Sequence, residues 1–165
     1  MFREMRRKNQ MLSRELCTEI LKQGTSGVLA VLGDDAYPYA VPLSYVYADE
    51  KLYFHSAVSG HKLDAVKAHS KASFCVIAKD QVVPEKYTTY YQSVIAFGTV
   101  RVLDDDQEKM DAIQKLSLKY TPNDPVQRQM AEIERYWNSL CMMELTITHM
   151  TGKQAKELVF QPVGN

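Results

Sequence analysis

The segment from Lys51 to Lys62, KLYFHSAVSGHK, combines residue types that could hold a phosphate group. An apolar run, Leu52–Phe54, precedes a turn rich in serine and glycine, after which a short helical pattern begins. Hydroxyls, backbone N–H groups at a helix start and a cation together form a typical phosphate-binding corner. The candidate residues of this corner are Ser56, Ser59, Gly60, His61 and Lys62. An ordinary solvated turn has a similar composition, so both interpretations stay open on these residues alone.

Three charged or titratable side chains in this segment could take part directly in binding or chemistry. Lys62 is the strongest candidate, because the helix dipole disfavours a cation at a helix start unless an anion is bound there. His61 precedes it, but consecutive helical residues project differently, so the two need not touch the same oxygens. His55 ends the strand, where it could be a structural histidine bonded to a carbonyl or a histidine close to a bound ligand.

The elements that must position these residues are short strands joined by turns. Strands are expected over residues 27–32, 39–47, 51–55, 72–78, 90–103 and 140–148, with a polar connection over 79–88. Helices are expected over about 13–24, 62–69 and, as a pair, about 105–139. Because the strands follow one another without regular helical crossovers, the fold class is mainly β with appended helices, an antiparallel barrel. Pro42 cannot donate to a β-ladder, so it is expected at an edge, a bulge or a gap facing a cofactor.

Length and composition limit the classes of function. The 165 residues are expected to form one domain over 1–165, and 45% hydrophobic with 24% charged residues suits a packed core. The formal net charge of zero gives no indication of nucleic-acid or anionic-membrane partners. With no bilayer-length apolar run and no signal-peptide pattern, the protein is expected to be cytoplasmic.

Cys17, Cys75 and Cys141 are expected to be reduced, and no local spacing predicts a metal site. The basic cluster at Arg3, Arg6, Arg7 and Lys8 is expected to be a solvated arm, the alternative being an arm that packs on a partner subunit or an anionic ligand.

Nearly the whole chain resembles the pyridoxamine 5′-phosphate oxidase-like FMN-binding split-barrel superfamily, and within it the 5-nitroimidazole-resistance (Nim) group. The segments that carry the resemblance are FREMRRK, GDDAYPYAVPLSYVYADEKLYFHSAVSGHKLDAV, KYTTYYQSVIAFGTVRVL and HMTGK. The resemblance implies a six-stranded antiparallel split β-barrel that forms a homodimer. Two FMN molecules would lie in the grooves between the protomers.

The resemblance also implies roles for particular residues. Backbone groups of Val41, Pro42, Leu43 and Ser44 would face the flavin ring, and Ser59, His61 and Lys62 would bind its phosphate. Gln92 and Ser93 would reach the flavin of the neighbouring subunit. His55 occupies the position that the Nim group ties to the active site, and His149 and Lys153 are weaker candidates near the pocket. The oxidase branch has an arginine where this chain has His61. It also has Arg-Gln where this chain has Gln92-Ser93, and this second difference weakens the case for pyridoxal phosphates as substrates.

The function expected from the resemblance is an FMN-dependent oxidoreductase that passes electrons from a reduced donor to a nitroaromatic or quinone-like acceptor. Such chemistry belongs to the flavin, and the protein supplies position and polarity. Two alternatives stay open. One is a non-enzymatic flavin-binding protein, and the other is a haem-handling split barrel with His55, His61, His69 or His149 as an axial ligand.

Overall fold

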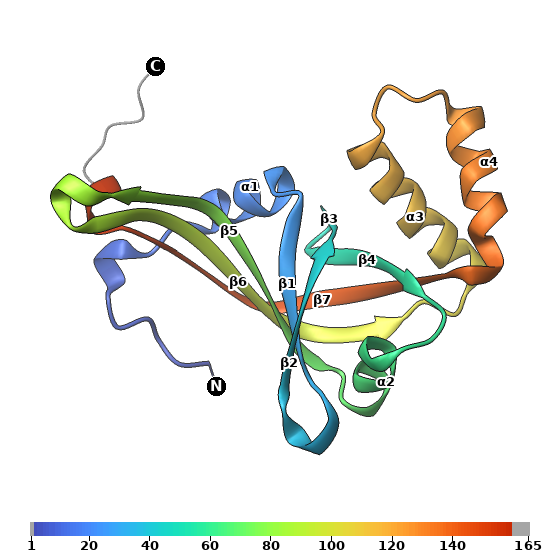
Figure 1. Ribbon diagram of the computed structural model, residues 1–165, viewed down its shortest axis with the longest axis horizontal. Coiled ribbons are helices and arrows are strands. Elements are labelled where there is room, and N and C mark those ends of the chain that lie inside the picture. The colour runs from blue at the N-terminus through green and yellow to red at the C-terminus, as the bar shows by residue number, and fades with distance from the viewer. Residues whose placement is uncertain (1, 160–165) are drawn as a thin grey trace.

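A computed structural model describes residues 2–159, which form one antiparallel sheet with four α-helices (Figure 1). The strands are β1 Ser26–Leu32, β2 Pro38–Ser44, β3 Val46–Ala48, β4 Lys51–Ala57, β5 Lys71–Val83, β6 Thr88–Val102 and β7 Leu140–Gln154. The helices are α1 Arg14–Gln23, α2 His61–Ala68, α3 Asp106–Tyr120 and α4 Val126–Tyr136. The strand order is β2-β1-β5-β6-β7-β4-β3, and each neighbouring pair is antiparallel.

The prediction of six strands is wrong, because the expected strand 39–47 divides at Tyr45 into β2 and β3. Residues 38–44 pair with β1, whereas residues 46–48 pair with β4 near the other end of the sheet order. Tyr45 is fully buried, and its backbone N–H donates to the hydroxyl of Tyr120 at 3.0 Å. One bent segment therefore supplies both outer strands, and this continuity brings the two edges of the sheet toward closure.

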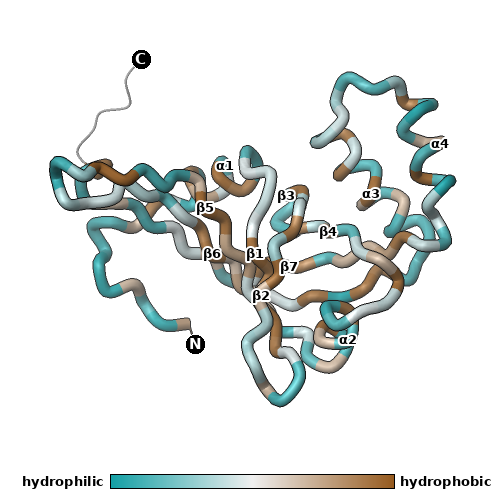
Figure 2. Tube along the Cα trace, in the orientation of Figure 1, coloured by the Kyte–Doolittle hydropathy of each residue, from teal (hydrophilic) through white to brown (hydrophobic). Residues whose placement is uncertain are grey.

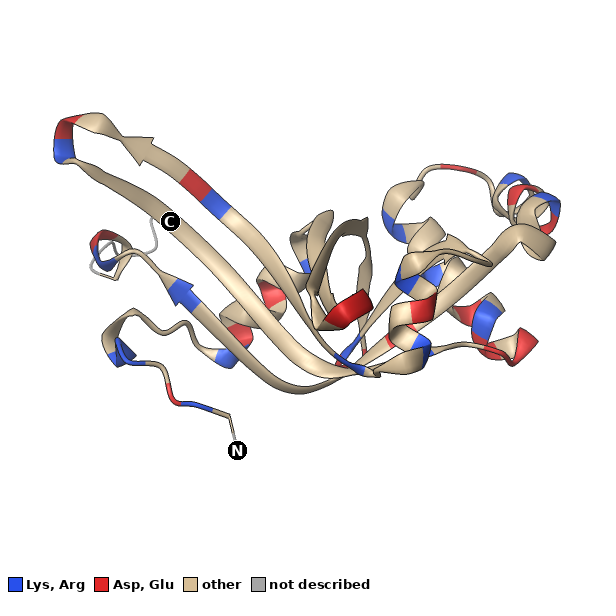
Figure 3. Cartoon of the chain, turned by 60° about the horizontal axis from the view of Figure 1, so that its bottom comes forward, with Lys and Arg blue, Asp and Glu red and all other residues tan. Residues whose placement is uncertain are grey.

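The polar connection expected over residues 79–88 is also wrong, because β5 and β6 continue through it as a hairpin. Their register runs from Lys79 opposite Gln92 to Val83 opposite Thr88, and a short turn of 3₁₀-helix, Pro84–Lys86, joins them. The stretch contains Lys79, Asp80, Pro84, Glu85 and Lys86, so its composition resembled that of a loop and concealed its strand character. The hairpin projects from one end of the molecule in Figures 1 and 3. Strand β7 likewise continues past the expected end at residue 148, to Gln154.

Three helix limits follow the sequence pattern closely. The hydroxyl of Ser13 accepts a hydrogen bond from the N–H of Leu16 at 3.2 Å, which caps α1, and Gly24 follows its last residue. The Asp105 carboxylate accepts from the N–H of Glu108 at 2.9 Å and caps α3. Among residues 2–159, no helix is long and apolar enough to cross a bilayer.

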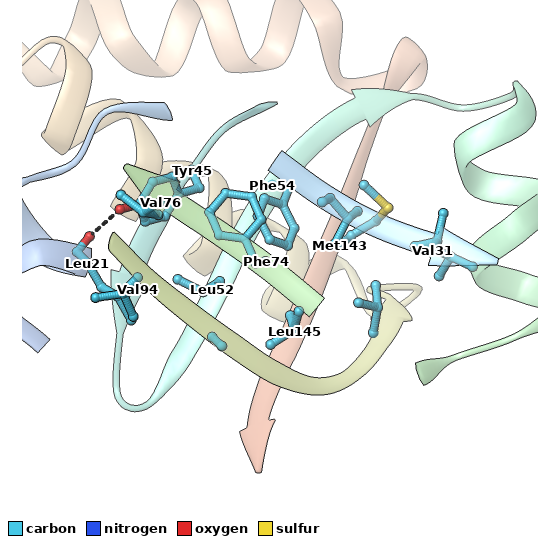
Figure 4. Close-up of a cluster of buried hydrophobic side chains, with 14 of the residues drawn as sticks. Leu21, Val31, Tyr45, Leu52, Phe54, Phe74, Val76, Val94, Met143 and Leu145 are labelled. Carbon is cyan, nitrogen blue, oxygen red and sulfur yellow. Dashed lines mark hydrogen bonds between the residues drawn. The ribbon is translucent and has the colours of Figure 1, made fainter. Parts of the chain in front are cut away.

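The main core lies inside the curved sheet, where the apolar residues of the strands concentrate (Figure 2). Phe74 contacts Tyr45 and Phe54 at ring-centroid distances of 4.9 and 5.0 Å (Figure 4). The hydroxyl of Tyr45 donates to the carbonyl of Leu21 at 2.7 Å, so this buried polar group is satisfied and ties the core to α1.

A second apolar cluster attaches the helical pair to the sheet. Ile113 of α3 and Ile133 of α4 pack in one cluster with Tyr53 of β4 and Met142 of β7. Charged side chains gather mainly on the helices and turns, and the long strands carry few of them (Figure 3). The helical pair is therefore packed against β3, β4 and the first part of β7.

Candidate functional site

The corner between β4 and α2 has an open backbone suited to an anion. Gly60 has φ 128°, in the region that favours glycine, and a Cβ placed there would meet no atom of the described residues within 4 Å. Within the described chain, no side chain caps the start of α2, so its first N–H groups lack side-chain acceptors. Ser59 lies in this turn, whereas Ser56 belongs to β4 rather than to the turn as expected. The N–H groups of Leu63 and Asp64 donate to the carbonyl of Gly60 at 2.9 and 3.2 Å, so the donors that the corner can offer an anion are the N–H groups before them and the ammonium of Lys62.

Lys62 and His55 lie within electrostatic reach of each other at this corner. Lys62 is half-buried, and this burial lowers the pKa of its ammonium group. Neighbouring atoms remove water from the His55 ring and lower its pKa, and the charge of Lys62 lowers it further. His55 keeps an exposed edge, so it is an accessible, uncharged imidazole at pH 7.

The side chain of His61 packs against the β1–β2 hairpin and is not free beside Lys62. Its ring stacks on Tyr39 with centroids 4.2 Å apart and planes 14° from parallel, and its Nε2 lies 3.6 Å from Oδ2 of Asp34. These contacts join the start of α2 to β2. The sequence analysis did not predict this role for His61. Its partners, Tyr39 and Asp34, belong to the β1–β2 hairpin, and only the packing of α2 against that hairpin brings them together. A contact between His61 and phosphate stays a prediction.

Strand β2, which carries the residues expected along a flavin ring, lies at an edge of the sheet. Val41 and Leu43 are half-buried, and Pro42 and Ser44 are exposed. Within residues 2–159, β2 pairs with β1 on one side and has no strand partner on the other. Pro42 therefore occupies an edge strand, one of the places expected for it, and the outer backbone of β2 can face a ligand.

Gln92 and Ser93 are not near the corner in one chain. They lie on β6 where the free hairpin joins the three-stranded part of the sheet, and the amide of Gln92 donates to Oε1 of Gln154 at 3.1 Å. Figure 1 places this hairpin and α2 toward opposite ends of the molecule. Contact between Gln92 or Ser93 and a ligand at the corner would require a second copy of the chain.

The two weaker candidates have structural neighbours. The ring of His149 stacks on Phe2, with centroids 4.4 Å apart and planes 10° from parallel. The ammonium of Lys153 lies 5.6 Å from the centre of the Tyr91 ring. Both residues belong to β7 rather than to a segment that follows the last strand.

The helical pair and the end of β4 enclose a cavity of about 460 Å³ that sequence reasoning missed. His55, Ser56 and Ala57 form one wall of this cavity, which leads directly along the chain into the corner. Its other walls come from α3, α4, the segment between them, the short turn after α4 and the start of β7. The residues are Ile113, Ser117, Thr121, Asp124, Arg128, Gln129, Glu132, Ile133, Tyr136, Ser139 and Leu140. The cavity could not be predicted from the sequence, because its walls come from residues 55–57 and 113–140, which are far apart in the chain.

A family model described as pyridoxamine 5′-phosphate oxidase matches residues 13–154. The chain belongs to this family. The matched range runs from the cap of α1 to the end of β7, so it includes the corner, the edge strand β2 and Gln92 and Ser93 of β6. Membership in the pyridoxamine 5′-phosphate oxidase family agrees with the mainly antiparallel β-fold.

One protein of similar sequence and two proteins of similar structure can be compared with this chain. An uncharacterized protein of Rhizobium meliloti (strain 1021) is 29% identical over 98 residues, which span 59% of this chain and 60% of the relative. A proposed 5-nitroimidazole antibiotic resistance protein of Bacteroides thetaiotaomicron is similar in structure, with a TM-score of 0.75, 20% identity and coverage of 87% of this chain and 86% of the other. The FAD and haem binding protein of Mycobacterium smegmatis has a TM-score of 0.73, 22% identity and coverage of 90% and 74%. These structural similarities show the shared fold.

Proposed function

We propose that the protein is a flavin-dependent oxidoreductase that binds FMN and reduces nitroaromatic, 5-nitroimidazole-like, or quinone-like acceptors. The observation that carries the proposal is the corner, where Lys62 stands beside the uncapped start of α2 and the open backbone of Gly60. A dianionic flavin phosphate would satisfy these donors and would balance the lysine charge. The family match and the proposed resistance function of the similar Bacteroides protein support the assignment.

Each predicted cofactor residue has a place in this proposal. Ser59 and Lys62 would hold the phosphate, and His61 would keep α2 in position through its contacts with Tyr39 and Asp34. The edge backbone of β2, Val41 to Ser44, would lie along the flavin ring, and Gln92 and Ser93 would come from a second subunit of a homodimer. A bound flavin would supply two-electron transfer, from a reduced donor to the acceptor.

His55 is proposed as the residue that contacts the acceptor. It presents an uncharged imidazole to the cavity beside the corner, because removal of water from the ring lowers its pKa. A neutral imidazole can donate one hydrogen bond to an acceptor oxygen without adding a fixed charge to the site.

The first experiment is a titration of the apoprotein with FMN, followed by an anaerobic assay with a reduced donor and a 5-nitroimidazole. We expect saturable binding near one FMN per chain and consumption of the nitro compound. The absence of saturable flavin binding would refute the proposal. Tight FMN binding with no turnover of any nitro or quinone acceptor would identify a non-enzymatic flavin-binding protein instead.

Substitution of His55 separates a role in turnover from a role in folding. His55→Ala should lower kcat/KM for the nitroimidazole while FMN affinity stays within a few-fold, since the ring would contact the acceptor and not the phosphate. His69→Ala, an exposed histidine just after α2, is the matched control. A His55 variant that melts at a lower temperature but keeps wild-type turnover would return His55 to a structural role.

A second candidate function, haem binding, is favoured by the same cavity. Of the four histidines, His55 lines this space, whereas His61 and His149 are stacked on aromatic rings. The similar Mycobacterium protein binds FAD and haem. Titration with haemin tests this candidate, because a Soret band that is lost in His55→Ala would identify an axial ligand.

A further inference from the structure

We infer that the cavity between β4 and the α3–α4 pair is the acceptor site, and that its carboxylates select uncharged planar acceptors over anionic ones. The inference rests on the proposed function and names its substrate class. The residues that set the preference are Asp124, in the segment between the helices, and Glu132 on α4.

The cavity adjoins both parts of the proposed flavin site, because β4, which supplies one of its walls, leads into the corner and also contacts β2, the strand proposed to lie along the ring. Residues 55–57 line the cavity, and residues 59–62 of the same short segment form the corner. The two ligands would therefore lie against one continuous piece of chain, residues 55–62. The volume of about 460 Å³ falls within the range of small-molecule sites, roughly 300–1,000 Å³.

The interior of the cavity suits a flat, largely apolar molecule. Ile113 and Ile133 are buried there, and Leu140 adds apolar surface from the start of β7. Tyr136 stands half exposed among the lining residues and adds an aromatic ring to them, with the guanidinium of Arg135 over that ring at 5.2 Å from its centre. An aromatic face beside aliphatic groups binds heteroaromatic and quinoid rings well.

The charges of the lining residues disfavour an anion. Asp124 and Glu132 contribute two carboxylates, and Arg128 contributes one guanidinium, which leaves a net charge of −1. Arg128 is itself drawn to Asp124, with Nη1 3.7 Å from Oδ1, and His55 is uncharged at pH 7. Oε1 of Glu132 lies 3.8 Å from Nη1 of Arg135, but Arg135 does not line the cavity. A flavin phosphate at the corner would balance Lys62, so that charge would not attract a second anion.

The segment that carries Asp124 is held in place by its own hydrogen bonds. The amide of Gln129 donates to the carbonyls of Thr121 and Asp124, each at 3.0 Å. At the other side of the cavity, the hydroxyl of Ser139 donates to the carbonyl of Tyr136 at 3.0 Å. The backbone that carries Asp124 is thus held in place before a ligand arrives, which lowers the cost of ordering this wall of the cavity.

The test compares two nitro compounds on the flavin-loaded, oxidised protein. Calorimetry measures the dissociation constants of a neutral 5-nitroimidazole and of 4-nitrobenzoate, and anaerobic assays give kcat/KM for both. We expect the neutral compound to bind more tightly by about 3–10-fold, the effect of one nearby unit charge in a wet site. Glu132→Gln and Asp124→Asn should each tighten 4-nitrobenzoate about 3-fold or more and leave the nitroimidazole unchanged.

Glu134→Gln is the matched control, because Glu134 lies on the same helix, is exposed and does not line the cavity. Equal effects of Glu132→Gln and Glu134→Gln would overturn the inference, as would equal binding of the two nitro compounds by the wild type. Loss of acceptor binding when FAD replaces FMN would show that the cavity holds the nucleotide half of the cofactor instead. The binding measurements can also be made on the apoprotein, so a failure of flavin binding would be seen separately.

Discussion

At the scale of single residues, Lys62 offers the sharpest test of the phosphate corner. Lys62→Ala should weaken FMN binding far more than riboflavin binding, because riboflavin lacks the phosphate. A charge-assisted contact of this kind contributes roughly 1.5–3 kcal/mol. Fluorescence titration of the apoprotein with both flavins gives the two affinities. Lys67→Ala, an exposed lysine later in α2, is the control. Equal losses for FMN and riboflavin would mean that Lys62 acts on the ring or on folding.

The environment of Glu144 on β7 indicates how the free energy of unfolding depends on pH. Its carboxylate is buried, and burial alone raises its pKa, but hydrogen bonds from Lys51 at 3.0 Å and Arg101 at 3.1 Å outweigh burial and lower the pKa below 4.5. The stabilisation is therefore present above about pH 4.5 and is lost as pH falls through the lower pKa of the folded state.

Replacement of this carboxylate should flatten the acid limb of the stability curve. Glu144→Gln should lower the free energy of unfolding at pH 7 by roughly 1–3 kcal/mol, because Lys51 and Arg101 lose an ionised acceptor yet remain partly exposed to water. Urea unfolding of wild type and variant between pH 3 and pH 7 measures both quantities. Parallel curves for the two proteins would exclude Glu144 as the source of the acid sensitivity.

At the scale of elements, Tyr120 at the end of α3 fastens the break between β2 and β3. Its hydroxyl accepts from the N–H of Tyr45 at 3.0 Å and lies within hydrogen-bond distance of the carbonyls of Tyr45 and Thr25. Tyr120→Phe should cost about 1–3 kcal/mol of stability, since it removes the partner of the N–H of the buried Tyr45. Urea unfolding measures the loss, and Tyr136→Phe on α4 should change stability little. An unaltered midpoint in Tyr120→Phe would show that water or another group replaces the hydroxyl.

The same elements show what the sequence can and cannot predict. Caps such as Ser13 and Asp105 are local hydrogen bonds, so α1 and α3 could be placed from the pattern. The division at Tyr45 could not, because it depends on which distant strands each half meets. The corner was predicted as a contiguous motif, whereas the stacking of His61 on Tyr39 and the cavity around His55 depend on the packing of separate elements.

At the scale of the whole molecule, the β5–β6 hairpin predicts a second subunit. Ile77 and Val82 on this projecting arm are 66% and 68% exposed, so the arm offers apolar side chains that a second subunit would cover. We expect a homodimer in which the arm of each chain brings Gln92 and Ser93 to the other's flavin. Light scattering of the FMN-loaded protein should give twice the mass of the chain, and a monomer mass with FMN still bound would refute the shared groove.

Mixed dimers test which chain supplies which residue. Lys62→Ala and Gln92→Ala homodimers should both bind FMN weakly if each site uses Lys62 of one chain and Gln92 of the other. Co-expressed heterodimers of the two variants should then contain one intact site and recover tight binding at half the sites. Recovery in none of the heterodimers would place both residues on the same chain's site.

The pairing of β4 with β7 affects the order in which the strands can assemble during folding. The β1–β2 and β3–β4 hairpins form between near neighbours in the chain, whereas β4 pairs with β7 between residues as distant as Lys51 and Thr146. Closure of such a long loop is entropically costly and slow. The docking of β7 is therefore expected to limit the folding rate, and substitutions at the β4–β7 contact should slow refolding more than those at the β1–β2 turn.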